Sequence, residues 1–191
     1  MKLLAFSDLH RDLGQAARLV EMSEEADAVA GVGDFASVHE GLAETIEALK
    51  PINKPTVLVP GNNETEEALR EATGGWATVL HGGGTEMEGI PFFGIGAGIP
   101  VTPWDWSFDL TEEEADAKLA ACPENAVLLS HSPPKGHVDK GLGSAAVLRA
   151  AEDKQPRLVL CGHIHELWGQ ESRIAQARVM NLGPAGTFIE L

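Results

Sequence analysis

The stretch Val59-Pro60-Gly61-Asn62-Asn63-Glu64-Thr65 (VPGNNET) marks the end of a predicted strand. The apolar run over 56–59 leads into it and is typical of a short buried strand, predicted over 54–59. A helix is predicted over 64–72, and the glycine pair at 74–75 ends it. Between strand and helix the chain needs a turn, and turn chemistry accounts for one asparagine. The second asparagine therefore calls for another explanation.

Strands and helices alternate outward from this stretch. Ser37 is predicted to cap a helix that runs to Leu49, and Thr111 with Glu114 is predicted to form a capping box for a helix reaching about 121. The glycine-rich segment 76–98 is typical of several short strands, and 167–190 of a strand meander. The remaining predicted strands are 2–6, 26–32, 125–129 and 157–161, and the remaining helices are 13–22 and 144–152. This order predicts an α/β fold of mixed sheets covered by helices, in a single domain over 1–191.

Polar residues follow the predicted strands directly at their C-terminal ends. Ligands in open α/β sheets bind just outside these ends, so the polar groups are expected to converge. Carboxylate, imidazole and amide oxygen together suit divalent ions such as Mn, Fe or Zn. Seven such donors exceed the needs of one ion and match two ions that share a carboxylate. They are Asp8, His10, Asp34, Asn62, His131, His163 and His165.

The ordered set D-x-H, G-D, G-N-x-[DE], a strand-end H and G-H-x-H resembles the calcineurin-like metallophosphoesterases, over residues 3–165 and into the closing strands. The segment HSPPKGHVDKGLGS (131–144) also resembles a loop of small prokaryotic members. The resemblance implies a four-layer α-β-β-α sandwich of two mixed β-sheets, the metallo-dependent phosphatase fold, with a two-metal site between loops. It implies Mn, Fe, Zn or Ni as the ions, with Mn favoured. In that scheme Asp34 bridges the ions, Asp8, His10 and His165 hold one, and Asn62, His131 and His163 hold the other.

Asn63 departs from the family pattern, because most members of the family carry histidine at this position. That histidine is thought to protonate the leaving oxygen or to stabilise charge on the phosphoryl group. An amide donates a hydrogen bond but gives up no proton at neutral pH, so Asn63 is predicted to keep only the second task. A helix cap near Glu64 is the alternative role for Asn63. General acid catalysis contributes about 10²–10⁴ in rate, so the predicted enzyme depends on good leaving groups.

The leading hypothesis is a metal-dependent phosphoesterase in which a hydroxide activated by two metal ions hydrolyses phosphodiester or phosphomonoester bonds of small substrates, nucleotides among them. Asp34 and Asn63 are the catalytic candidates, and Asn63, Arg11 and His137 are candidates for substrate contact. Diesters are favoured, since no lysine or arginine cluster near the motifs awaits a dianion. The alternatives are a catalytically weak, metal-stabilised protein-interaction scaffold of the same fold and a nucleotide-sensing protein.

Composition narrows the partners further. The formal net charge of −15 disfavours non-specific binding to nucleic-acid backbones. No apolar run is long enough to span a bilayer, no signal peptide is recognised, and two cysteines make no disulfide framework, so a cytoplasmic location is expected. Cys161 is expected to be a buried filler rather than a thiolate ligand. Trp104 and Trp106 either stack on a base or pack, and packing is favoured, with one ring partly exposed near the site.

Overall fold

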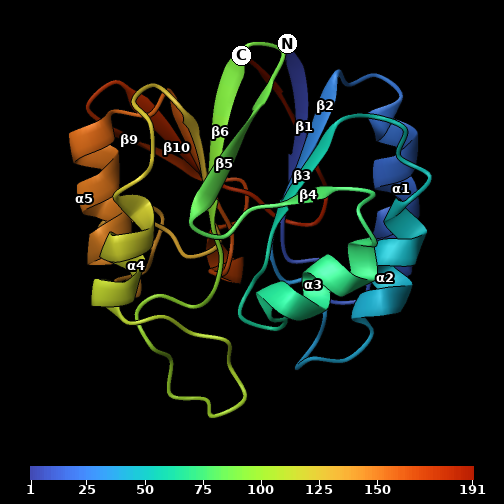
Figure 1. Cartoon of the computed structure of the whole chain (residues 1–191), viewed down its shortest axis with the longest axis horizontal. Coiled ribbons are helices and arrows are strands. Elements are labelled where there is room, and N and C mark those ends of the chain that lie inside the picture. The colour runs from blue at the N-terminus through green and yellow to red at the C-terminus, as the bar shows by residue number, and fades with distance from the viewer.

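The computed structural model describes residues 1–191 and contains two mixed β-sheets that pack face to face between helices (Figure 1). The first sheet has the strand order β11 (Thr187–Glu190), β1 (Lys2–Phe6), β2 (Ala28–Val32), β3 (Thr56–Val59) and β4 (Thr78–Val79). The second has the order β5 (Gly83–Met87), β6 (Ile90–Ile95), β7 (Val127–Ser130), β8 (Leu158–Cys161), β10 (Ala177–Asn181) and β9 (Glu171–Ile174). The predicted fold class is confirmed.

Helices cover the outer face of each sheet (Figure 1). The first sheet carries α1 (Leu13–Ser23), α2 (Leu42–Leu49) and α3 (Glu66–Thr73), and the second carries α4 (Glu112–Leu119) and α5 (Ala145–Lys154). Successive residues of a strand point to opposite faces, so β1 contributes to two cores. Leu3 and Ala5 pack between the sheets, whereas Leu4 and Phe6 pack under the helices. A third cluster lies between the second sheet and its own helices.

Parallel pairing sets where the loops emerge. In the first sheet β1, β2, β3 and β4 are mutually parallel, and in the second sheet β6, β7, β8 and β10 are parallel. The loops that follow β1, β2 and β3 therefore leave at one edge, as do those that follow β7 and β8. These are the loops that carry the predicted donor residues.

Two local predictions are wrong. Ser37 does not cap α2, because that helix begins at Leu42 with Gly41 as its N-cap at φ 74°, a left-handed conformation suited to glycine. Nor is the C-terminal segment a simple meander: β9 and β10 form an antiparallel pair in the second sheet, whereas β11 crosses to the first sheet and pairs with β1. A short 3₁₀ turn, η1 (His165–Leu167), precedes them. The capping box of Thr111 and Glu114 is confirmed at the start of α4.

None of the helices combines the length and the apolar character that crossing a membrane requires.

Candidate metal centre

The seven donor residues come together where the loops of the two sheets meet. One group combines the carboxylates of Asp8 and Asp34 with the rings of His10 and His165, and its ligand atoms lie within 4.8 Å of one another. A second group, within the same limit, combines Asp34 with His131 and His163. Asp34 is thus the residue that the two groups share.

Asn62 joins the second group through its amide oxygen. Its Oδ1 lies 3.1 Å from Nδ1 of His163 and 3.3 Å from Nε2 of His131. The other end of the amide identifies this orientation, since Nδ2 donates to Oγ of Ser107 at 3.0 Å. That hydroxyl in turn donates to a carboxylate oxygen of Asp109 at 2.6 Å, so it accepts from Asn62. The oxygen that a metal ion would need therefore faces the histidines.

Four of the donor residues have an unusual backbone conformation. Asp8, His10, Asp34 and His163 all have positive φ, at 57°, 43°, 58° and 68°. Non-glycine residues adopt this region rarely and at a cost, and they do so mostly where surrounding contacts hold them and where function benefits. Gly61 makes room for the shared carboxylate, because a Cβ there would lie 2.0 Å from Oδ1 of Asp34.

The side chain of Glu64 links the loop after β2 to the loop after β3. Its buried carboxylate accepts backbone hydrogen bonds from Asp34 at 2.8 Å, from Ala36 at 2.9 Å and from Gly61 at 2.6 Å. Burial, and next the charge of Asp34, raise the pKa of Glu64 to about 7, while the backbone donors act in the opposite direction. Sequence reasoning missed this role of Glu64; its place at the end of the G-N-x-[DE] motif was the available signal.

Charge at the shared carboxylate is balanced by an imidazole. Burial alone would raise the pKa of Asp34, but the charge and hydrogen bond of His131 lower it well below its usual range. Burial disfavours the charged ring of His131, yet the Asp34 carboxylate raises its pKa. His163 behaves differently, because burial and then the charge of His131 lower its pKa to about 4. Ligand atoms must be deprotonated to bind metal, so protons on these rings compete with a metal ion.

Asn63 is turned toward Asp34. Its Nδ2 donates to Oδ2 of Asp34 at 2.8 Å, its backbone N–H donates to Oδ1 at 2.9 Å, and its own Oδ1 accepts from the backbone of Val38 at 2.7 Å. The helix-cap alternative is wrong, because Oγ1 of Thr65 caps α3 by accepting from the backbone of Ala68. One hydrogen of the amide remains, so a contact of Asn63 with a phosphoryl group stays a prediction.

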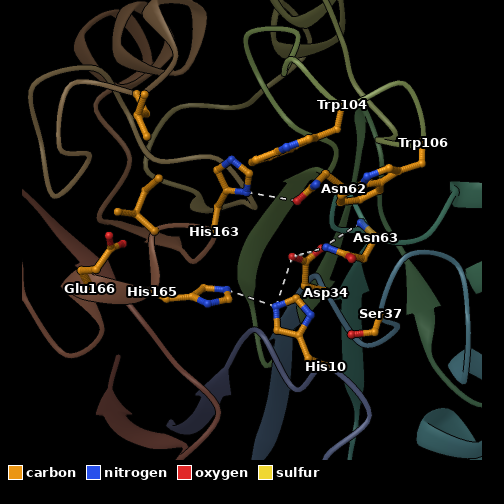
Figure 2. A pocket seen from close by; sticks show the side chains of 12 residues that line it. His10, Asp34, Ser37, Asn62, Asn63, Trp104, Trp106, His163, His165 and Glu166 are labelled. Atoms are coloured by element: carbon orange, nitrogen blue, oxygen red, sulfur yellow. Dashed lines mark hydrogen bonds and ion pairs between the residues drawn. The ribbon is translucent and has the colours of Figure 1, made fainter.

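A cavity of about 530 Å³ opens over the shared carboxylate, and Figure 2 shows His10, Asp34, Asn62, Asn63, His163 and His165 around it. Its lining contains no lysine and no arginine. Arg11 and His137 do not line it: Arg11 lies 3.9 Å from the carboxylate of Glu40, and Nδ1 of His137 lies 3.2 Å from Oγ of Ser172. Contact of these two residues with a substrate stays a prediction.

Several supporting residues were not singled out from the sequence. Ser7 donates its hydroxyl to Oδ2 of Asp8 at 2.5 Å, and Nε1 of Trp168 donates to the same oxygen at 3.2 Å. Asn181 donates its side-chain amide to the carbonyls of Gly162 and Ile164, which fixes the loop that carries two of the histidines. Their signal in the sequence is weak, because Ser7 only neighbours a motif and Asn181 lies 18 residues beyond His163. Cys161 is a buried core residue, as expected.

Solved structures share this fold. A crystal structure of TT1561 from Thermus thermophilus has a TM-score of 0.77 at 21% identity, covering 96% of this chain and 90% of that one. A dimetal phosphatase from Danio rerio has a TM-score of 0.66 at 13% identity, covering 97% and 88%.

Sequence comparison extends the likeness. The UPF0046 protein K07C11.7 of Caenorhabditis elegans is 24% identical over 198 residues, covering 88% of this chain but only 65% of that protein's length. The family model of the calcineurin-like phosphoesterase superfamily domain matches residues 1–188 of this chain. This range is almost the full length and includes all seven converging donor residues. The chain therefore belongs to the calcineurin-like phosphoesterase superfamily.

Proposed function

We propose that this protein is a phosphodiesterase that works with two divalent metal ions. The observation that carries the proposal is the sharing of the Asp34 carboxylate by two groups of donors. Asp8, His10 and His165 would hold one ion, Asn62, His131 and His163 the other, and Asp34 would lie between them. The mixture of nitrogen and oxygen donors suits Mn, Fe, Zn or Ni, with Mn as the first choice. Ions held there would activate water for attack on phosphorus and neutralise charge on the phosphoryl oxygens.

The residues of the chain favour a particular kind of ester. A diester carries one negative charge and a monoester carries two near neutral pH, and the cavity offers no lysine or arginine to balance the second charge. Asn63 donates to Asp34 and lines the cavity, but its amide supplies no proton to a departing oxygen. Small diesters with a weakly basic leaving group, such as aryl diesters, therefore fit best. The name of the dimetal phosphatase with the same fold also supports a two-metal mechanism.

We also propose that residues 1–191 form one domain. The C-terminal strand β11 completes the first sheet beside the N-terminal strand β1, and the amino group of Met1 donates to the backbone carbonyl of Leu191. The two ends of the chain therefore belong to the same sheet.

The test is hydrolysis of bis(p-nitrophenyl) phosphate by the purified protein loaded with Mn²⁺. Turnover that stops on addition of a chelator and returns with Mn²⁺ is the expected result. Asn53→Ala, a change at an exposed side chain, serves as the matched control and should behave like the wild type. Absence of turnover in protein shown by elemental analysis to hold two ions would overturn the proposal in favour of the scaffold alternative.

A further inference from the structure

Two indole rings line the cavity beside the donor residues. Trp104 and Trp106 stack with ring centroids 5.7 Å apart and an interplanar angle of 14°. Trp104 nevertheless remains 50% exposed, so the stack covers only part of it. Figure 2 places Trp106 beside Asn62 and shows the ring of Trp104 reaching toward His163; both rings lie away from Glu166 and His165. Leu142, which is 62% exposed, lines the same cavity from another loop.

The segment 98–110 that carries these rings is fixed to the metal centre. Asp109 accepts hydrogen bonds from the backbone and hydroxyl of Thr102, both at 2.8 Å, and from the hydroxyl of Ser107. Ser107 accepts from the side chain of Asn62, and the backbone of Phe108 donates to the Asn62 carbonyl at 2.9 Å. The indoles are therefore held at a set position relative to a predicted metal ligand, which is how preorganised ligand sites are built.

Trp106 is fixed separately. The ring nitrogen Nε2 of His39 lies 2.5 Å from its backbone carbonyl oxygen, and the two rings meet edge to face with centroids 6.5 Å apart. Trp106 in turn supports one face of Trp104. If packing were the whole purpose, the outer indole would be covered; instead a large aromatic surface is kept at the opening of a polar cavity.

From this geometry we infer that Trp104 is the platform on which the planar aromatic group of a phosphodiester stacks, the phosphoryl group being bound at the metal centre. The inference rests on the proposed function and names its substrate class. The cavity volume of about 530 Å³ lies within the range of about 300–1,000 Å³ typical of small-molecule sites. With no lysine or arginine in the lining, an uncharged flat ring suits this wall better than a second anionic group. Both faces of an aromatic or heteroaromatic ring can stack on an indole, whereas an aliphatic group of similar size lacks the π-face.

The test uses the monomethyl esters of phenylphosphonate, cyclohexylphosphonate and methylphosphonate, named below by their parent acids. Each carries the single negative charge of a diester, its C–P bond resists hydrolysis, and methoxide is a poor leaving group. Their dissociation constants are measured by calorimetry on the Mn²⁺-loaded protein. Phenylphosphonate should bind more tightly than cyclohexylphosphonate, which has a similar size but no π-face. Alanine substitution of a stacking aromatic side chain typically lowers affinity about 5- to 100-fold. Trp104→Ala should therefore weaken the binding of phenylphosphonate, relative to that of methylphosphonate, about 5- to 100-fold. Trp104→Phe should retain most of the preference.

Val101→Ala is the matched control, because Val101 is an exposed apolar residue of the same segment that does not line the cavity. Its phenyl preference should equal that of the wild type. Equal binding of the phenyl and cyclohexyl compounds, or an equal loss of both in Trp104→Ala, would overturn the stacking platform while leaving the metal centre intact. Failure of even methylphosphonate to bind, together with no hydrolysis of bis(p-nitrophenyl) phosphate, would instead overturn the proposed function.

Discussion

Asn63→Ala is expected to destabilise the metal-free protein, because Asn63 orients the carboxylate at the centre of the site. The substitution removes the charge-assisted hydrogen bond from Nδ2 to Asp34 at 2.8 Å and the bond that Oδ1 accepts from Val38 at 2.7 Å. A hydrogen bond to a charged group contributes about 1.5–3 kcal/mol and a neutral one about 0.5–1.5 kcal/mol. The backbone N–H of residue 63 keeps its bond to the other carboxylate oxygen. The free energy of unfolding should therefore fall by about 2–4 kcal/mol.

Urea denaturation in the presence of a chelator measures this change without a contribution from metal binding. Asn53→Ala is the control, because the exposed Asn53 makes no side-chain hydrogen bond in the structure, and its effect should stay within about 0.5 kcal/mol. A second measurement separates positioning of Asp34 from general stability. Replacing a residue that orients a metal ligand typically lowers metal affinity about 10- to 100-fold. The affinity of the folded Asn63→Ala protein for Mn²⁺ should therefore fall about 10- to 100-fold.

The reasoning would be refuted by a loss of less than about 1 kcal/mol with an unchanged dependence on urea concentration. It would be refuted equally by a folded Asn63→Ala protein that binds Mn²⁺ as tightly as the wild type. Either outcome would mean that the neighbouring backbone alone sets the orientation of Asp34.

Three further predictions concern the donor set, pH and the leaving group. Asp34→Ala should lose at least one of two Mn²⁺ equivalents in elemental analysis, because the ions would face each other without the shared carboxylate; full occupancy would contradict the assignment. The ring of His81 accepts a hydrogen bond from the backbone of Gly96, and burial lowers its pKa to about 4. As the pH falls, the unfolded chain therefore binds this proton before the folded protein does. The stability present above about pH 6.5 is lost as the pH falls toward 4. His81→Asn should reduce that loss by about 1–2 kcal/mol in chelator-treated protein, a figure discounted for the partly exposed ring. His39→Asn serves as the comparison, and equal pH profiles would contradict the role of His81. Asn63→His should raise kcat/KM for an alkyl diester more than for an aryl diester at equal metal occupancy, because a proton donor helps a basic alkoxide most, and an unchanged ratio would argue that position 63 does not serve the leaving group.

The donor residues were predictable from the sequence because each follows a strand and the strands are short and apolar. Parallel pairing then brings their ends to one edge, so Asp8, Asp34 and His131 meet although they are far apart in the chain. The start of α4 was predictable for a similar reason, since capping is local: Thr111 bonds to the backbone three positions later. At α3 the cap is Thr65 rather than the predicted Asn63, although the helix itself is present.

What the sequence could not supply depends on contacts between loops. Glu64 bonds to the backbone of Asp34, 30 residues away, and no local pattern indicates that partner. Ser37 looks like a helix cap, but the chain between it and α2 turns through Gly41, so the helix starts later. The direction of the Asn63 amide is likewise set by Asp34 and Val38, which lie on the loop after β2.

The amide at position 63 and the indole at position 104 favour the same substrates for independent reasons. With Asn63 directed at Asp34, the site has no histidine at the position from which relatives are thought to protonate the leaving oxygen. An aromatic alcohol departs as a weakly basic phenolate and needs little help from a proton donor. The same flat ring fits the exposed face of Trp104, which lines the cavity next to the donors. A protein with these metal ligands but no proton donor at position 63 should hydrolyse alkyl esters slowly. For aryl esters the proton donor matters little, and the ring of Trp104 adds binding energy for the aryl group. The two features therefore predict that removing either the ring of the substrate or the ring of Trp104 costs affinity, while adding a proton donor at position 63 broadens the range of leaving groups.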